Sequence, residues 1–242
     1  VPGENCDGGA FIKNSIDKGA SAFITETSLD SLSGFDLGSL DVTALCVKDA
    51  RRALSTVSAN FYHRPSERLS LTGITGTNGK TTTAYILEAL FRAQGARTGV
   101  VGTINYHYGD KELSAPVTTP ESLDLNRMLD EMIKDEIINC FLEVSSHALQ
   151  QSRVHDMRFK AGIFTNLSRD HLDFHGDMES YKNAKKKLFL DNHVQWKVFN
   201  VDDPVGREFF REFKTDSFTT GIDNNADFKA EDITLTKAGS QF

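Results

Sequence analysis

A glycine-rich segment, LTGITGTNGKTTTAYILEALF at residues 71–91, has the composition of a phosphate-binding loop that runs into a helix. Its glycines, Gly73, Gly76 and Gly79, stand three residues apart. The common pattern G-x-x-x-x-G-K-[ST] would place a glycine where this chain has Ile74. The segment is therefore either a variant nucleotide-binding loop or a glycine-rich turn without a ligand.

The residues around Lys80 supply the chemistry of a nucleotide site. Gly76 and Gly79 permit a tight turn in which backbone N–H groups converge, and the start of a helix adds free N–H groups and positive dipole charge. Lys80 offers a cation to the β- and γ-phosphates, and the hydroxyl of Thr81 can bind Mg²⁺. Because these residues lie between an apolar strand and an amphipathic helix, the sequence favours a nucleotide site over a turn capped by threonine and asparagine.

Further polar residues follow later apolar runs of the chain. Glu143 ends such a run within LEVSSHALQQSRV, residues 142–154. His171 follows the next run, within FTNLSRDHLDFHGDMESYKNAKKKLF, residues 164–189, and Lys185 lies on the helix expected there. Parallel strands present ligand-binding residues at their carboxyl ends, so we expect Glu143 and His171 at one edge of a sheet, beside the phosphate loop.

Several neighbouring residues have two interpretations. His175 follows His171 by four residues, which places two ligands on one metal in a helix, but the glycine after it favours a turn. His147 either caps and packs or takes part in catalysis. Asp170 is expected to be a local hydrogen-bond acceptor.

The loop GITGTNGKTTT resembles the ATP loop of the Mur ligases and of their relatives, the folylpolyglutamate synthetases, which are ATP-dependent amide ligases. The segments PVTTPES, EVSSHAL and NLSRDHLDFHG resemble one branch more closely, the UDP-N-acetylmuramoyl-tripeptide synthetases or MurE family. The resemblance runs almost from end to end of the chain. By itself the loop does not choose a member of the superfamily, whereas together the segments do.

The resemblance implies roles for individual positions. The ATP-binding residues would be Gly76, Thr77, Asn78, Gly79, Lys80, Thr81 and Thr82. The ligands of Mg²⁺ would be Thr81, Glu143, His171 and a carbamate formed on Lys185, and the catalytic set would be Lys80, Glu143, His171 and Lys185. The residues that bind the UDP-muramoyl dipeptide would be Thr118, Thr119, Ser145, Gln151 and Arg153, with Asn5 and Cys6 on the uridine side.

The reaction implied by the resemblance joins a diamino acid to UDP-MurNAc-L-Ala-D-Glu. ATP phosphorylates the D-glutamate side chain, and an amine of meso-diaminopimelate or L-lysine displaces the phosphate. Three alternatives remain: a folylpolyglutamate or cyanophycin-type synthetase, a phosphate-loop switch or kinase, and a nucleotide-binding fragment without catalysis. The segments EVSSHAL and TTPE speak against the first, and the set Glu143, His171 and Lys185 speaks against the second.

Composition limits the possible classes. The 242 residues carry a net charge of −7, which argues against a general surface for nucleic acid. Runs of about eighteen apolar residues, which would predict a membrane span, do not occur. Cys6, Cys46 and Cys140 are far apart, so we expect a reducing cytoplasm and neither disulfides nor a cysteine zinc site. A monomer is expected.

Residues 1–66 are expected to form a partial N-terminal α/β domain that binds the UDP part of the substrate. It would contain a helix at 9–19, the strands SAFIT and VTALCV, and a helix at 49–62 with Asp49 near its start. The polar stretch HRPSERLS would be the linker to the next domain. The abrupt start at VPGENCDGG and end at ITLTKAGSQF suggest a fragment of a longer protein.

Residues 67–242 are expected to form the central ATP-binding domain, incomplete at its end. The runs LSLTGIT, TGVVGTI, INCFLEV, AGIFTNL and KVFNV predict strands, which alternate with helices after Lys80, at 121–134 and at 178–192. The first helix would have Ile86, Leu87, Leu90 and Phe91 on one face, and the second would bury Leu125, Met128, Leu129, Met132 and Ile133. NVDDP predicts a turn with a helix cap, and ITLTKAGSQF predicts two strands joined by a turn. The predicted class is α/β, with a mostly parallel sheet covered by helices on both faces.

Overall fold

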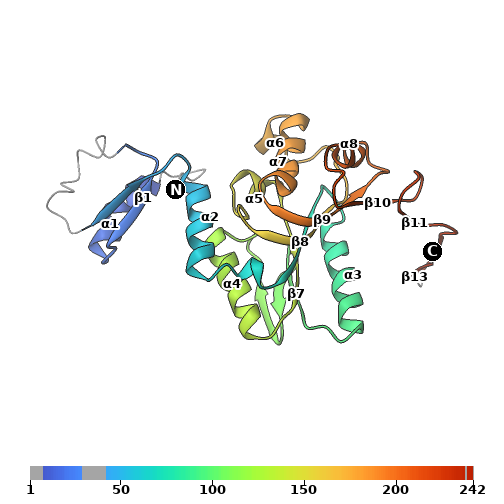
Figure 1. Cartoon of the computed structure of the whole chain (residues 1–242), viewed down its shortest axis with the longest axis horizontal. Coiled ribbons are helices and arrows are strands. Elements are labelled where there is room, and N and C mark those ends of the chain that lie inside the picture. The colour runs from blue at the N-terminus through green and yellow to red at the C-terminus, as the bar shows by residue number, and fades with distance from the viewer. Residues whose placement is uncertain (1–7, 29–41, 238, 242) are drawn as a thin grey trace.

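A computed structural model describes residues 8–28, 42–237 and 239–241 of the chain (Figure 1). A small N-terminal sheet stands beside a larger unit built on a nine-stranded sheet. Asn5 and Cys6, which were expected to contact uridine, lie outside the described residues. Within the described ranges, no helix is both long and apolar enough to cross a membrane.

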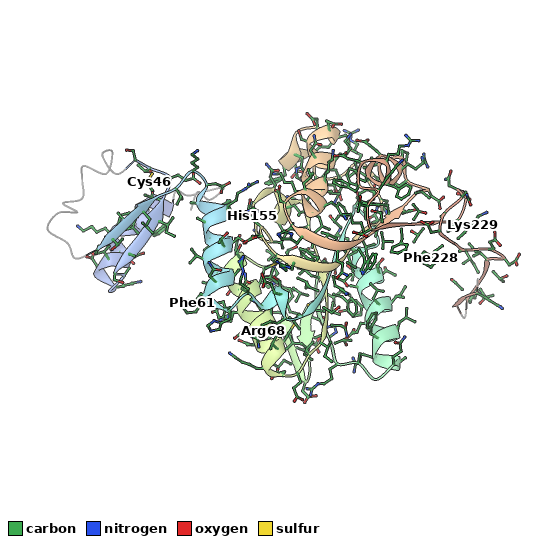
Figure 2. The ribbon with its side chains drawn as sticks, in the orientation of Figure 1. Cys46, Phe61, Arg68, His155, Phe228 and Lys229 are labelled. Carbon is green, nitrogen blue, oxygen red and sulfur yellow. The ribbon has the colours of Figure 1, made fainter. Side chains whose placement is uncertain are left out.

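The N-terminal elements match their predicted positions. Strands β1 and β2 pair in parallel, and the exposed thiol of Cys46 lies at the end of β2 (Figure 2). Asp49 caps the helix that follows, because its carboxylate accepts a hydrogen bond from the backbone N–H of Arg52 at 2.8 Å. The elements are η1 (Gly8–Phe11), α1 (Ile12–Asp17), β1 (Ala22–Thr25), β2 (Thr43–Cys46) and α2 (Ala50–Phe61).

Helix α2 lies against α4 (Ser122–Lys134) of the larger unit (Figure 1). The hydroxyl of Ser55 on α2 donates to the carbonyl of His155 at 2.8 Å, and Arg64 forms an ion pair with Asp156 at 2.8 Å. The predicted linker contains a short 3₁₀ helix, η3 (Pro65–Glu67), whose proline is buried. The segment before residue 67 is therefore packed onto the larger unit, and the division into domains at residue 66 stays a prediction.

The central sheet has the strand order β11-β10-β9-β8-β3-β7-β4-β5-β6. All neighbours from β11 to β4 pair in parallel, as the alternation of strands and helices predicts. Strand β3 comes first in sequence among the strands of this sheet and lies in its middle, so later strands are added on both sides of it. A ligand is expected at the carboxyl ends of the strands, where the strand order reverses. The parallel strands are β3 (Ser70–Thr75), β4 (Thr98–Val101), β7 (Asn139–Glu143), β8 (Arg158–Phe164), β9 (His193–Asn200), β10 (Ser217–Gly221) and β11 (Phe228–Lys229).

An antiparallel hairpin extends the sheet beyond β4 and was not predicted. The expected strand TGVVGTI ends at Val101, and the chain turns before β5 (Asn105–Tyr108) and β6 (Lys111–Ser114). The alternating burial of β5 and the tight turn at Gly109 fit a half-exposed hairpin. In the sequence, the turn is indicated by YGDK at residues 108–111.

Helices cover both faces of the sheet, which confirms the predicted class. Helix α3 packs on one face through Ala84, against Ile74 and Phe141. On the other face, α4, α5, α7 and α8 bury a larger cluster that includes Leu129 and Phe209. The helices are α3 (Lys80–Ala93), α5 (Ser146–Gln150), α6 (Leu172–His175), α7 (Met178–Leu190) and α8 (Pro204–Glu212).

The apolar face predicted for α3 is partly wrong. Ile86 and Leu90 are more than half exposed, and the helix instead turns Ala84 and Glu88 toward the sheet. The carboxylate of Glu88 can be buried because it accepts hydrogen bonds from Nε2 of His107 at 2.9 Å and from Thr98 at 3.3 Å. A buried, paired carboxylate is not visible in a hydrophobic pattern.

The stripe predicted for α4 is confirmed: Leu125, Met128, Leu129 and Met132 are buried, and Ile133 packs against them. The terminal hairpin is also confirmed, as β12 (Thr234–Thr236) pairs with β13 (Gly239–Gln241). The helix cap predicted at NVDDP is confirmed, since Asp203 caps α8, whereas the extent of α8 and the pair β10–β11 were not predicted.

Asp203, in the predicted NVDDP turn, caps α8 and also holds the loop after β8. Its Oδ1 accepts from the N–H groups of Val205 at 2.8 Å and Gly206 at 3.1 Å, while Oδ2 accepts from Leu167 N–H at 2.9 Å. We expect Asp203→Ala to lower the free energy of unfolding by about 2 kcal/mol, because it removes a helix cap and a loop contact together. Denaturant titration would measure this, and Asp203→Asn, which keeps one acceptor, should lose less; equal losses would contradict the dual role.

Candidate active site

A cavity of about 470 Å³ opens at the carboxyl ends of the central strands and is lined by eight of the predicted functional residues. It lies between the phosphate loop after β3, the loop after β7 and helix α7. The predicted residues that line it are Lys80, Thr118, Thr119, Ser145, Gln151, Arg153, His171 and Lys185. Thr103, His147 and Tyr181 also line it.

The phosphate loop spans the end of β3 and the start of α3. Gly76 has φ +151°, and an added Cβ would lie 3.1 Å from the backbone N and O of Asn166, so only glycine fits there. Gly79 precedes α3, whose first N–H groups have no partner within the helix and point toward the loop. Gly73 lies within β3, where a Cβ would meet the ring of Phe159 at 2.8 Å. Gly73 is therefore required for packing within the strand, whereas Gly76 and Gly79 are required for the conformation of the loop.

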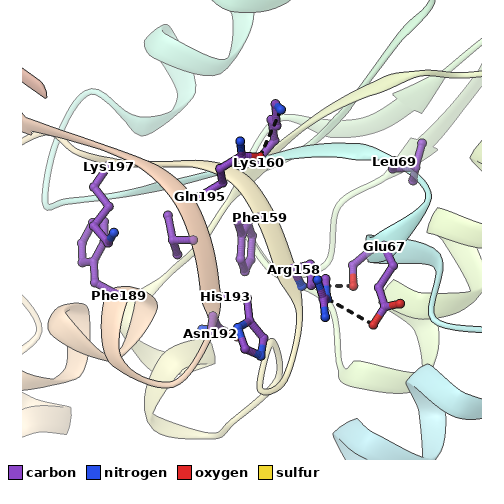
Figure 3. Close-up of a pocket in the computed structure, with 12 residues that line it drawn as sticks. Glu67, Leu69, Arg158, Phe159, Lys160, Phe189, Asn192, His193, Gln195 and Lys197 are labelled. Carbon is purple, nitrogen blue, oxygen red and sulfur yellow. Dashed lines mark hydrogen bonds and ion pairs between the residues drawn. The ribbon is translucent and has the colours of Figure 1, made fainter. Parts of the chain in front are cut away.

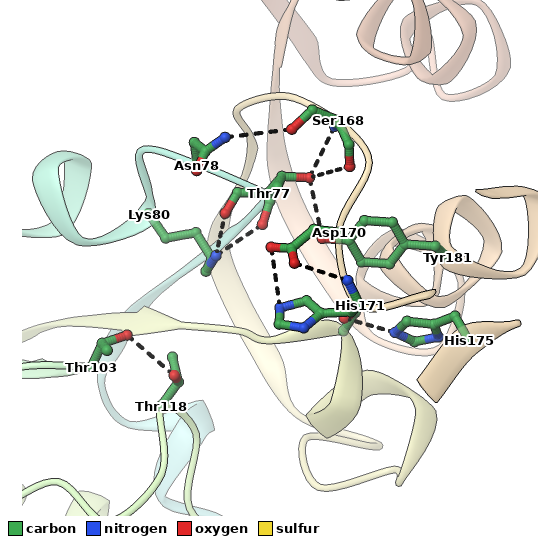
Figure 4. Close-up of polar contacts among 12 residues, drawn as sticks. Thr77, Asn78, Lys80, Thr103, Thr118, Ser168, Asp170, His171, His175 and Tyr181 are labelled. Carbon is green, nitrogen blue, oxygen red and sulfur yellow. Dashed lines mark hydrogen bonds and ion pairs between the residues drawn. The ribbon is translucent and has the colours of Figure 1, made fainter. Parts of the chain in front are cut away.

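Two lysines converge on one carbonyl of this loop. The ammonium of Lys80 donates to Gly76 O at 2.9 Å and to Thr77 O at 2.8 Å (Figure 4). Nζ of Lys185 donates to Gly76 O at 2.7 Å. Lys185 is 1% exposed and lies 4.5 Å from the ring centre of Tyr181. Burial, followed by the charge of Lys80, lowers the pKa of Lys185 to about 6. Its amine is therefore mostly uncharged at neutral pH.

Burial also lowers the pKa of Lys80, against the opposing effect of Glu143 and Asp170. A bound polyphosphate would replace the carbonyl groups as partners of Lys80, since an anion is a stronger acceptor for an ammonium group.

Glu143 ends β7 and is completely buried. Its carboxylate accepts hydrogen bonds from the hydroxyl of Thr81 at 2.9 Å and from the N–H and hydroxyl of Thr103 at 3.0 and 3.1 Å. Within the described part of the chain these partners are all neutral. A carboxylate and a hydroxyl in contact beside the phosphate loop form a hard oxygen donor set, which fits Mg²⁺.

The loop at 116–122 is tied to the end of β7. The hydroxyl of Thr119 donates to Glu143 O at 2.8 Å and accepts from Ser145 N–H at 3.0 Å, while Thr118 contacts Thr103 at 3.1 Å (Figure 4). Ser145 in turn caps α5. The pair of threonines and the serine predicted from the resemblance thus lie side by side.

Arg153 reaches the same loop from beyond α5. Its guanidinium donates to Thr119 O at 2.8 Å, to Gln151 Oε1 at 2.7 Å and to the carboxylate of Glu121 at 2.8 Å. Arg153 therefore links Gln151 to the loop at 116–122, which borders the cavity.

The histidines gather at α6. His171 precedes this helix with a left-handed backbone, and its N–H donates to Asp170 at 2.9 Å, as expected for a local acceptor (Figure 4). His147 packs against the rings of His171 and His175, and Nε2 of His175 lies 2.9 Å from the hydroxyl of Ser146. The turn expected at His175 is a single turn of helix. Across the described ranges, no three His, Cys, Asp or Glu side chains lie close enough to share one metal ion.

The pH dependence of stability should report on His175. Burial, with His147, Lys185 and His171 adding to it, lowers the pKa of His175 to about 4. Between pH 6.5 and 4 the unfolded chain then binds the additional proton, so stability is lost as pH falls through that window. We expect His175→Asn to flatten this dependence, measured by denaturant titration at several pH values; an unchanged slope would contradict the assignment.

Several residues at the site were missed by sequence reasoning. Tyr181 is fully buried on α7 and its hydroxyl lies 3.1 Å from Thr77 Oγ1 (Figure 4). Thr165, Asn166 and Ser168 hydrogen-bond the phosphate loop from the end of β8. The polar run after the apolar strand in FTNLSRD was the available signal, because it marks the carboxyl end of a strand.

Two other cavities differ in their relation to this site. One of about 650 Å³ adjoins Gly79 and Thr83 and extends along β8 to β11, past Asn200 and Phe228. Another of about 560 Å³ lies at the opposite, amino-terminal ends of β8 and β9, where Arg158 forms an ion pair with Glu67 at 3.3 Å (Figure 3). The first adjoins the phosphate loop, whereas the second lies at the opposite end of the strands.

Comparison with known proteins identifies the relatives of this arrangement. Residues 74–242 match the family model of the Mur ligase middle domain. The chain is 39% identical over 242 residues to UDP-N-acetylmuramoyl-L-alanyl-D-glutamate–2,6-diaminopimelate ligase 1 of Clostridium acetobutylicum, which covers all of this chain and 48% of that protein. The chain thus spans about half the length of the curated relatives it matches.

Solved structures agree with the fold. A structure of a UDP-N-acetylmuramoyl-L-alanyl-D-glutamate–2,6-diaminopimelate ligase superposes with a TM-score of 0.82 at 28% identity, covering 96% of this chain and 46% of that one. Folylpolyglutamate synthase of Mycobacterium tuberculosis shares the fold with a TM-score of 0.61 at 16% identity, covering 79% of this chain and 50% of that one.

Proposed function

Because the chain belongs to the Mur ligase family, we propose that it is the nucleotide-binding part of an ATP-dependent amide ligase that adds a diamino acid to the D-glutamate of UDP-MurNAc-L-Ala-D-Glu. One observation carries the proposal: Lys80, Glu143 and Lys185 converge on the phosphate loop beside the cavity that holds the predicted substrate residues. The name of the 39% identical relative supports diaminopimelate over L-lysine as the amino acid.

The nucleotide would lie across the start of α3. Its phosphates would bind the first N–H groups of the helix and Lys80, and its adenosine would enter the cavity that adjoins Gly79 and Thr83. That cavity is bordered by Ile163 and Phe228 and by the polar side chain of Asn200, a mixture that suits a planar base.

Magnesium would be held by Thr81 and Glu143, joined by His171 and by a carbamate on Lys185. The ion would neutralise negative charge on the phosphates when bound. The uncharged amine of Lys185 supports the carbamate, because only a neutral amine adds CO₂. In that addition the nitrogen forms a bond to the carbon of CO₂ and releases one proton, which leaves an anionic group with two oxygens.

The substrate side of the cavity would receive the muramoyl dipeptide. Thr118, Thr119 and Ser145 present hydroxyl groups, and Arg153 presents a planar cation that suits a carboxylate or pyrophosphate. Lys80 offsets the repulsion between the substrate carboxylate and the triphosphate, and the rigid loops place the two reactants together. ATP would phosphorylate the D-glutamate carboxylate, and the amine would then displace phosphate to form the amide.

The alternative of a folylpolyglutamate or cyanophycin-type synthetase has less support. The relative named for diaminopimelate addition aligns with the whole chain, whereas the folylpolyglutamate synthase shares the fold at 16% identity. A nucleotide-binding fragment without catalysis remains open for the isolated chain. The expected monomer, cytoplasmic location and lack of nucleic-acid partners stay predictions.

The experiment that tests the proposal is a ligase assay of the full-length protein. ATP hydrolysis should require UDP-MurNAc-L-Ala-D-Glu together with an amino acid, and a panel of diaminopimelate, L-lysine and L-ornithine should show diaminopimelate to be preferred. Hydrolysis that is independent of the UDP substrate, or that responds to folate, would overturn the proposal.

A further inference from the structure

The segment after β8 lies directly against the phosphate loop. Thr165 and Asn166 follow the last residue of β8, and a Cβ added at Gly76 would collide with the hydroxyl of Thr165 and lie 3.1 Å from the backbone N and O of Asn166. The two segments are almost ninety residues apart in sequence, as the 88-residue separation of Asn78 and Asn166 shows. Their contact is therefore a property of the folded sheet.

Both backbone groups of Asn78 are bonded to the side chain of Asn166. Asn78 N–H donates to Oδ1 at 3.0 Å, and Nδ2 donates to Asn78 O at 3.1 Å. The orientation of the amide is fixed, because the N–H needs an acceptor and the carbonyl needs a donor. The hydroxyl of Thr165 adds a second bond to Asn78 O at 2.7 Å, and Asn166 O accepts from Thr77 N–H at 2.9 Å. Thr165 and Asn166 thus satisfy both the N–H and the C=O of Asn78, as the backbone of a neighbouring strand would.

These bonds decide which amides of the loop face a ligand. The C=O and N–H of a planar trans peptide point in opposite directions. Because Asn78 O is held toward Thr165 and Asn166, the N–H of Gly79 in the same peptide is directed away from them. The N–H groups of Thr77 and Asn78 already donate to Asn166, which leaves Gly79 and the first turn of α3 as the amides for an anion.

We propose that Thr165 and Asn166 are positioning residues of the nucleotide site, which hold the Asn78–Gly79 peptide so that Gly79 N–H faces the phosphates. This inference rests on the proposed nucleotide site. A loop held in its bound geometry before the ligand arrives loses less conformational freedom on binding, and it therefore binds more tightly.

Variants of matched size separate positioning from packing. Asn166→Leu keeps the volume of the side chain and removes both hydrogen bonds, and Thr165→Val does the same for the hydroxyl, whereas Thr165→Ser keeps it. We expect Asn166→Leu to weaken ADP binding by about tenfold to a hundredfold and Thr165→Val by about fivefold, with Thr165→Ser close to wild type. Because Thr165 and Asn166 also line the cavity proposed for adenosine, inorganic triphosphate, which would bind the loop without entering that cavity, should lose affinity in the same order as ADP. Calorimetry or ligand-detected NMR would measure these affinities.

Hydrogen exchange of the free chain gives an independent result. The Asn78 amide should exchange faster in Asn166→Leu, while amides of β3 keep their protection. Wild-type ADP affinity and unchanged Asn78 exchange in Asn166→Leu would overturn the inference, as would wild-type affinity of that variant for inorganic triphosphate. If the wild-type chain binds no ADP, the proposed nucleotide site fails, and the exchange of Asn78 still decides whether Asn166 holds the loop.

Discussion

Replacing Lys80 with alanine is expected to lower kcat/KM of the full-length protein in the proposed ligase reaction by about a thousandfold. In the free protein its ammonium group rests on two carbonyls of the phosphate loop, at 2.9 and 2.8 Å, so it is already placed beside the helix start where phosphates would bind. The variant would leave the charge on the transferring phosphoryl group without its nearest protein cation. Steady-state kinetics with varied ATP would measure the loss.

Lys182 provides a matched control for the Lys80 variant. It lies on α7, where its ammonium pairs with Glu208 at 2.9 Å and with Glu179 at 2.9 Å, and it does not line the cavity. Lys182→Ala removes the same charge, and we expect kcat/KM to stay within about twofold of wild type. Full activity of Lys80→Ala would contradict the phosphate-loop assignment.

Replacing Lys185 with methionine is expected to have opposite effects on activity and stability. Activity should fall by about two to three orders of magnitude, because the variant cannot form the proposed carbamate or supply its proposed contribution to magnesium binding. Stability should rise, because the pKa of Lys185 is about 6 in the folded chain against 10.5 when unfolded. Between those two pH values the unfolded state binds more protons than the folded state. The buried lysine therefore lowers the stability of the fold at pH 7, and that stability increases as pH rises.

The gain for Lys185→Met is expected to be about 3 kcal/mol at pH 7, less than the full proton linkage because the bond to Gly76 O is also lost. It would be measured by denaturant titration in buffer free of CO₂, with Lys186→Met as the control, since that lysine is partly exposed and pairs with Glu212. In the wild type, ¹³C-enriched CO₂ should give a carbamate signal that is absent from the variant. A wild-type protein with activity but without that signal would contradict the carbamate.

Much of the fold could be predicted from the sequence because buried parallel strands and amphipathic helices leave strong apolar patterns. The strand before the loop and helix α4 were predicted for that reason. The hairpin after β4 was missed because its strands are short and half exposed, and the face of α3 was misassigned because Glu88 is buried through a hydrogen bond to His107. Patterns of hydrophobicity contain no information on such paired polar groups.

The site was predictable where chemistry restricts residue type. Lys80, Glu143 and Lys185 were identified from the loop and from the resemblance, and the structure brings all three to one end of the sheet. Asn166 could not be identified in this way, because its role is to bond backbone atoms 88 positions earlier in the chain. An asparagine in a loop has many uses, and only the fold shows which one applies.

The hairpin also affects how the protein behaves at high concentration. An exposed edge strand offers unpaired backbone groups to a second molecule, and sheets with flat apolar edges aggregate by this route. Here β6 forms that edge, its four residues from Lys111 to Ser114 are exposed, and Lys111 pairs with Asp135 at 2.9 Å. A second molecule would have to desolvate these charges before it could add a strand. The short charged β6 therefore opposes the addition of a further strand at this edge of the sheet.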